Sequence, residues 1–188
     1  MIANHLPSGA RYVPNFADHA LGTWLLSQID AAEWRVDLKR RVQHYGWRYD
    51  YSARRVTADM HLGPLPGWMT RVTNSLAAQP EFDRRPDQVI VNEYMPGQGI
   101  SAHVDCAPCF GPAIASLSLG GPAEMVFRNR STGQRVNLLL EPLSLLILSG
   151  AARYEWSHEI PARKSDLIGG VRKPRCRRVS LTFRTVLA

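Results

Sequence analysis

The fold is decided by residues 114–149, which read IASLSLGGPAEMVFRNRSTGQRVNLLLEPLSLLILS. Apolar residues concentrate there in four short runs, at 114–119, 123–128, 134–141 and 144–149, each as long as a typical strand. Gly120-Gly121-Pro122 and Ser131-Thr132-Gly133 separate these runs, and such glycine and proline clusters mark tight turns. The stretch therefore predicts a series of short β-strands joined by turns.

Similar runs flank this stretch on both sides. They lie at 89–95, 101–105, 156–160 and 177–187, with Pro96-Gly97, Gly111-Pro112 and Gly169-Gly170 as further turns. Eight short strands spaced in this way predict a double-sheet jelly roll, that is, a double-stranded β-helix. We therefore expect residues 89–188 to form a jelly-roll core that carries the functional site.

Residues 1–88 have a different pattern. Apolar side chains at helical spacing predict one helix over 15–29 and a second from Pro66 to about residue 79. Between them, residues 41–51 alternate with period two, which predicts a strand with Tyr45, Trp47, Tyr49 and Tyr51 on one face. The expected class is mostly β with N-terminal helices packed outside the sandwich (α+β). We expect one domain over residues 1–188, with helices and a lid over the site in 1–88 and the jelly-roll core in 89–188.

The composition is that of a globular protein with a basic surface. Of 188 residues, 45% are hydrophobic and 21% charged, and no apolar run approaches the ~20 residues of a membrane span. Three cysteines, an odd and low number, argue against a disulfide framework and suit a reducing cytoplasm. We therefore expect a cytoplasmic monomer without a membrane partner. The net charge of +7 comes from 20 arginines and 3 lysines, which fits either an ordinary basic surface or contacts with phosphates.

His103-Val104-Asp105 has the spacing of a pair of metal ligands. Residues i and i+2 of a strand point to the same face, so His103 and Asp105 can bind one ion from one strand. His158, in the run YEWSHEI, can reach that ion from a neighbouring strand. Two imidazoles and one carboxylate leave positions open for a co-substrate and dioxygen, as in non-haem iron(II) oxygenases. A His-x-Asp pair alone is usually no more than a polar stretch of surface, so other motifs must decide the assignment.

The run Arg178-Val-Ser-Leu-Thr-Phe-Arg184 alternates strictly between polar and apolar residues. Arg178 and Arg184 share its polar face and lie roughly 20 Å apart at about 3.3 Å per residue. Their side chains can converge on the two carboxylates of a five-carbon diacid. Asn92 and Tyr94 share one face of the run 89–95 and are neutral donors for the same ligand. The alternative is a half-buried strand whose arginines meet solvent.

Taken in order, these motifs resemble the AlkB family of iron(II)/2-oxoglutarate dioxygenases. The resemblance covers residues 40–187 or so and rests on Asn92-Glu-Tyr94, Pro96-Gly97, His103-Val-Asp105, Ser116-Leu-Ser-Leu-Gly120, His158 and Arg178-x5-Arg184. It implies that His103, Asp105 and His158 bind Fe(II). It also implies that Arg178 pairs with the distal carboxylate of 2-oxoglutarate, that Arg184 lies by the carboxylate chelating the metal, and that Asn92 and Tyr94 hydrogen-bond this co-substrate. The spacing before His158 is closer to the branch with tRNA-modifying members and implies a bare oxygenase core.

The implied reaction uses O2 to dealkylate damaged bases in DNA or RNA, releasing formaldehyde, succinate and CO2. A base must be flipped out of a duplex, or lie in a single strand, to reach such a centre, and it needs aromatic walls. The run YGWRYDY at 45–51 is the candidate lid, with Tyr45, Trp47 and Tyr49 as contacts to the base and Arg48 as a contact to phosphate. The alternative is that these aromatic rings pack against the helices.

Residues 106–109 depart from the family's pattern. Family members that repair cationic bases often carry an acidic residue just past the ligating aspartate, but this chain has Cys106-Ala-Pro-Cys109 there. A neutral etheno adduct or a wobble uridine in RNA does not need that charge. We interpret both cysteines as loop residues, because a zinc site needs a further ligand pair and only Cys176 remains. The competing hypotheses are a tRNA-modifying hydroxylase or demethylase, and a nucleic-acid-binding jelly roll with an inactive site.

Overall fold

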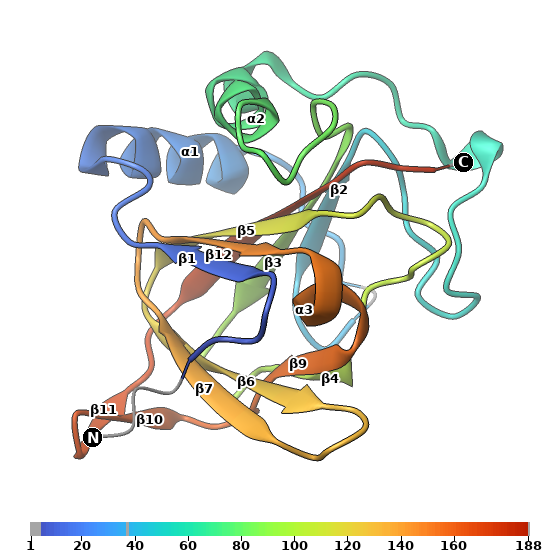
Figure 1. The fold of residues 1–188 in the computed structure, drawn as a ribbon. Helices are drawn as coiled ribbons and strands as arrows, with labels where there is room; N and C mark the ends of the chain where they lie inside the picture. The colour runs from blue at the N-terminus through green and yellow to red at the C-terminus, as the bar shows by residue number, and fades with distance from the viewer. Residues whose placement is uncertain (1–4, 37, 188) are drawn as a thin grey trace.

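Two antiparallel sheets packed face to face form the body of the molecule (Figure 1). The structure is a computed structural model and describes residues 5–36 and 38–187. The larger sheet has the order β1 (Ala10–Val13), β8 (Leu145–Leu148), β5 (Ile114–Gly120), β12 (Arg178–Arg184), β3 (Gln88–Tyr94) and β2 (Val42–Tyr45). The smaller sheet has the order β4 (Ile100–His103), β9 (Trp156–Ile160), β6 (Ala123–Asn129) and β7 (Arg135–Leu140). The predicted jelly-roll core, mostly β, is confirmed.

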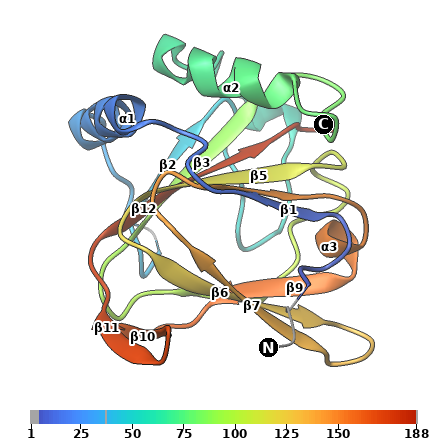
Figure 2. The same ribbon diagram turned by 60° about the vertical axis from the view of Figure 1, so that its left-hand side comes forward.

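Helices cover the outer face of the larger sheet (Figures 1 and 2). They are α1 (His19–Ala31) and α2 (Thr70–Ala77), and the latter continues a 3-10 turn, η2 (Gly67–Met69). The first helix begins later than the expected residue 15, because Asp18 is its N-cap and accepts a hydrogen bond of 2.7 Å from the Leu21 amide. Two shorter turns are η1 (Ala58–Met60) and α3 (Gly150–Tyr154). No helix within the described ranges is long and apolar enough to cross a membrane.

Alternation along the central strands separates a dry layer from a polar one. Val179, Leu181 and Phe183 of β12 are fully buried and pack with apolar residues of α1 and α2 in the main hydrophobic core. The residues between them face the other sheet, and the register pairs Arg178 with Tyr94 and Ser180 with Asn92. The packing that attaches the helices therefore also directs polar side chains into the space between the sheets.

The strand expected over residues 41–51 is shorter than the alternation predicted. It ends at Tyr45, because Gly46 has a φ of +76° and a Cβ there would overlap the Asp87 carbonyl oxygen. The alternation is lost at this turn, so the expectation that the aromatic residues of 45–51 share one strand face is wrong. Tyr45 points to the helix side, where its ring packs edge-on to Trp68 with centroids 5.6 Å apart.

Besides β1, η1 and α3, two further features were not expected from the sequence. Cys106 and Cys109, read as unbonded loop thiols, form a disulfide. A 3.2 Å hydrogen bond from the Cys109 amide to the Cys106 carbonyl closes a turn between the two cysteines and brings their Cα atoms to 5.3 Å. This local turn is enough to pair them, so the low number of cysteines was no argument against this single disulfide. The other element is the hairpin of β10 (Ser165–Ile168) and β11 (Val171–Pro174).

Candidate metal centre and co-substrate cavity

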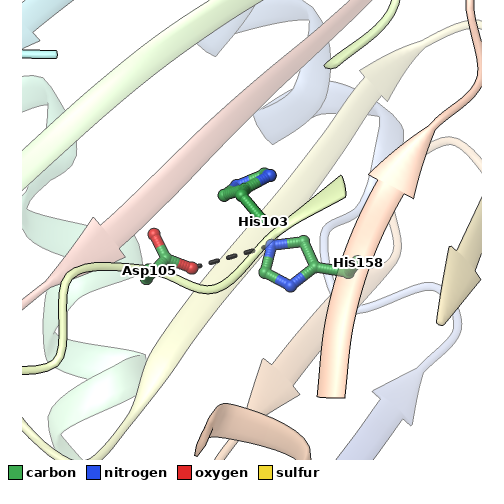
Figure 3. A group of neighbouring side chains, drawn as sticks. All are labelled: His103, Asp105 and His158. Atoms are coloured by element: carbon green, nitrogen blue, oxygen red, sulfur yellow. Dashed lines mark ion pairs between the residues drawn. The ribbon is translucent and has the colours of Figure 1, made fainter. Parts of the chain in front are cut away.

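Three side chains from neighbouring segments converge between the sheets (Figure 3). His103 and His158 are cross-strand partners in β4 and β9, and their ring centroids lie 4.4 Å apart. Asp105 does not share the strand of His103 as expected; β4 ends at His103, and Asp105 lies in the following loop. One ligand atom of each residue lies within 4.8 Å of the other two, and His158 Nε2 is 3.6 Å from Asp105 Oδ2. This arrangement can bind a single metal ion.

Each imidazole can present one ring nitrogen to a metal. The Nδ1 atom of His103 lies 2.8 Å from the Ser101 carbonyl oxygen, and an N–H donated there leaves Nε2 for a metal. Burial, and next the neighbouring His103, lower the pKa of His158 to about 4, against an opposing effect of Asp105. His158 is therefore uncharged at neutral pH, as metal coordination requires.

Asp105 is buried and ionised. Burial alone would raise the pKa of its carboxyl group, but Arg184, followed by His158 and His103, holds that pKa well below its usual range. Arg184 donates to Asp105 Oδ1 from Nε at 3.0 Å and from Nη2 at 2.6 Å. Arg153 fixes the backbone through a 2.8 Å hydrogen bond to the Asp105 carbonyl oxygen. The second carboxylate oxygen, Oδ2, remains directed at His158 and is the one available to a metal.

A cavity of about 400 Å³ extends from these three residues between the sheets, which is within the usual size of a small-molecule site. Arg178, only 2% exposed, lies in its wall and donates to Ser118 Oγ at 2.8 Å through Nη2. Its Nε and Nη1 atoms are buried and have no partner among the described residues, and its guanidinium carbon lies 5.3 Å from the Tyr94 ring centroid. A buried cation with two unused donors fits the carboxylate of a ligand.

Neutral donors line the cavity between the two arginines. Asn92 accepts a 2.9 Å hydrogen bond on Oδ1 from Arg40 Nε, which leaves its amide N–H groups as the donors for a ligand. Arg184 is also hydrogen-bonded to Gln88 Oε1, at 3.3 Å. Sequence reasoning missed Arg40 and Gln88, because neither belongs to a recognisable motif. The donors present fit Fe(II) at the three ligands and a dicarboxylate such as 2-oxoglutarate beside them.

The four residues expected to contact the substrate are separated by the structure. Tyr49 lines the cavity. Trp47 packs instead on His61, with ring centroids 4.6 Å apart, and Arg48 is exposed. Tyr45 lies on the helix side, and its hydroxyl donates to Gln43 Oε1 at 3.0 Å. Three other residues from this part of the chain, Arg40, Tyr51 and Arg54, also line the cavity, although they were not expected as base contacts.

Comparison with known proteins agrees with this geometry. A family model described as the 2OG-Fe(II) oxygenase superfamily matches residues 9–184. The alkylated DNA repair protein ALKBH8 homolog of Arabidopsis thaliana is 37% identical over 201 residues, covering 95% of this chain and 58% of that protein. The tRNA (carboxymethyluridine(34)-5-O)-methyltransferase alkbh8 of Xenopus tropicalis is 36% identical over 173 residues, covering 89% of this chain and 27% of that protein. The solved structure of OsALKBH1 superimposes with a TM-score of 0.71 at 19% identity, covering 96% of this chain and 98% of that one.

Proposed function

Because the chain belongs to the 2OG-Fe(II) oxygenase superfamily and is AlkB-like, we propose that it oxidises an alkyl substituent on a base of DNA or RNA. The observation that carries the proposal is one cavity that joins the three metal ligands, the two arginines and an aromatic wall of Tyr49 and Tyr51. The chain spans 58% and 27% of the two relatives described above, so the substrates in their names support the proposal only by analogy.

When bound, Fe(II), 2-oxoglutarate and O2 supply the oxidising chemistry and yield succinate and CO2. The protein's part is to hold and orient. His103, Asp105 and His158 would hold the metal, and Arg184 keeps Asp105 ionised. Arg178 neutralises a carboxylate in a space that the two sheets close to water, where a charge-assisted hydrogen bond is strong. Hydroxylation of an N-methyl carbon then gives a hemiaminal, which releases formaldehyde.

The charges around the cavity favour a neutral base over a cationic one. Among the described residues that line it, the one carboxylate is Asp105, which Arg184 already pairs. Arg40 and Arg54 lie in the wall as further cations. A positively charged methylated base finds no acidic partner there, whereas an etheno adduct or a modified uridine needs none. The second candidate function is hydroxylation of a tRNA base. It is favoured by the lack of a free carboxylate among the described lining residues and by the tRNA uridine in the name of the Xenopus relative.

The test is coupled turnover on modified oligonucleotides. Purified protein with Fe(II) and 2-oxoglutarate is expected to oxidise a single strand that carries an N-methyl base, an etheno base or a modified uridine. Mass spectrometry measures this oxidation, and succinate should be released in proportion to it. His103→Ala should abolish both products, whereas His19→Ala, an exposed histidine on α1, should keep them. Continued turnover by His103→Ala would overturn the metal assignment. Oligonucleotide binding by the wild type without succinate release would instead identify a binding module.

A further inference from the structure

Tyr51 reaches into the cavity from the segment that follows β2. Its hydroxyl oxygen is buried and has no hydrogen-bond partner among the described residues. The side chain lines the same cavity as Asn92, Tyr94 and Arg184, which are the candidate co-substrate residues. Tyr51 therefore shares one cavity with the candidate donors for the diacid, although its place in the sequence suggested a lid over the substrate.

The position of the Tyr51 ring is fixed on two sides. It packs edge-on to His44, with centroids 5.7 Å apart, and edge-on to Tyr49, with centroids 5.1 Å apart. The turn around it is closed by Asp50, whose Oδ1 accepts hydrogen bonds from the amides of Ser52 and Ala53 at 3.0 and 2.9 Å. The buried hydroxyl is thus held in place by packing and by a well-bonded turn.

The surroundings of this hydroxyl suit an anion. Burial raises the pKa of Tyr51, with Arg184 and Arg40 as the nearby cations that act in the opposite direction. The phenol is therefore protonated at neutral pH and can donate a hydrogen bond. A buried hydroxyl without a partner is unfavourable, and this cost disappears when a ligand provides an acceptor.

We propose that the Tyr51 hydroxyl donates a hydrogen bond to a carboxylate oxygen of bound 2-oxoglutarate, so that the segment after β2 forms one wall of the co-substrate site. Tyr49 lines the same cavity and packs edge-on against Tyr51, so a ligand bound to Tyr51 would also hold the Tyr49 ring in place. The inference depends on the family's co-substrate and not on which nucleic acid is the substrate.

The test removes one oxygen atom, the Tyr51 hydroxyl. For Tyr51→Phe, calorimetry without oxygen, using Mn(II) in place of Fe(II), should show 2-oxoglutarate binding roughly 10- to 100-fold weaker, as expected for loss of a hydrogen bond to a charged group. Binding of Mn(II) itself should be unchanged. The melting temperature of the ligand-free variant should equal or exceed that of the wild type, because an unpartnered buried hydroxyl has been removed. In turnover, KM for 2-oxoglutarate should rise more than kcat falls.

The matched control is Tyr154→Phe, which removes a hydroxyl from an exposed ring that does not line the cavity and should leave 2-oxoglutarate affinity within about twofold of the wild type. Unchanged affinity in Tyr51→Phe would overturn the inference. A Tyr51→Phe protein that also melts earlier and binds Mn(II) more weakly would overturn it as well, since the role would then be structural. If the wild-type protein does not bind 2-oxoglutarate, both this inference and the proposed function are overturned. That result is distinguishable from an unchanged affinity in Tyr51→Phe.

Discussion

Replacing Arg178 by methionine should move stability and affinity in opposite directions. The wild-type guanidinium is 2% exposed, makes one hydrogen bond to Ser118 and leaves two donors without a partner among the described residues. Without a ligand, this buried charge is compensated only by that bond and by the Tyr94 ring. Buried charges replaced by apolar side chains of similar volume often give a more stable protein. The ligand-free variant should therefore gain about 1 kcal/mol, which raises the melting temperature by about 2–4 °C in a chain of this length.

Affinity for 2-oxoglutarate should fall steeply in the same variant. Each hydrogen bond from the guanidinium to a carboxylate contributes about 1.5–3 kcal/mol, and two are available at Nε and Nη1. Loss of both corresponds to a dissociation constant roughly 10² to 10⁴ times larger. Calorimetry with Mn(II) measures the affinity, and thermal unfolding followed by circular dichroism measures the stability of the ligand-free protein.

A second substitution separates charge from geometry. Arg178→Lys retains the cation but not the planar pair of donors, so it should bind 2-oxoglutarate with intermediate affinity and show no gain in stability. The reasoning is refuted if Arg178→Met melts several degrees below the wild type and keeps its affinity within about threefold. That result would mean that the guanidinium supports the sheet and leaves the ligand to other donors.

Two further predictions concern stability. His158 has a pKa of about 4 when folded, against 6.5 as its ordinary value, so between these pH values the unfolded chain binds more protons. The metal-free protein should lose up to about 3 kcal/mol of unfolding free energy from pH 6.5 to 4, measured by urea titration; a flat profile contradicts this. In the wild type, Arg175 donates to Asp166 at 2.6 and 2.8 Å. Asp166→Asn should lower the free energy of unfolding by about 3–5 kcal/mol, because it leaves the buried Arg175 without its counter-charge. A melting temperature within about 2 °C of the wild type would contradict it.

The jelly roll was predictable because its strands are short, apolar and bounded by glycine and proline turns. The eight runs expected from residue 89 onward correspond to β3 to β9 and β12, with ends that differ by a few residues. The hairpin of β10 and β11 was not predictable, since its strands carry exposed side chains such as Leu167 and Val171 and no clean alternation. The Asp166–Arg175 ion pair joins the two ends of this hairpin, and Asp166 also accepts a hydrogen bond from the Glu124 amide of β6; no local pattern predicts these side-chain contacts.

His103, Asp105 and the two arginines were predictable for a similar reason, since they belong to motifs of fixed spacing, whereas His158 was expected as a distant third ligand and from the family resemblance. The substrate side was not, because one glycine at residue 46 ends the alternation on which the prediction of a shared aromatic face rested. After that turn, the direction of each ring depends on tertiary contacts. The Trp47 ring packs against His61, while Tyr49 and Tyr51 line the cavity. Sequence periodicity ends where the backbone leaves the strand, and so does any prediction built on it.

The strict alternation of β12 connects the stability of the fold to the chemistry of the site. A slip of one residue would place Val179, Leu181 and Phe183 in the polar cavity and direct Arg178 and Arg184 toward the helices. Burying three large apolar side chains is worth roughly 1.5–3 kcal/mol each, so the slipped register loses several kcal/mol before any charge is considered. The buried arginines, which would be costly by themselves, are therefore held between the sheets by the apolar residues that alternate with them. The hydrophobic core beneath α1 and α2 therefore keeps β12 in the register that directs Arg178 and Arg184 into the cavity.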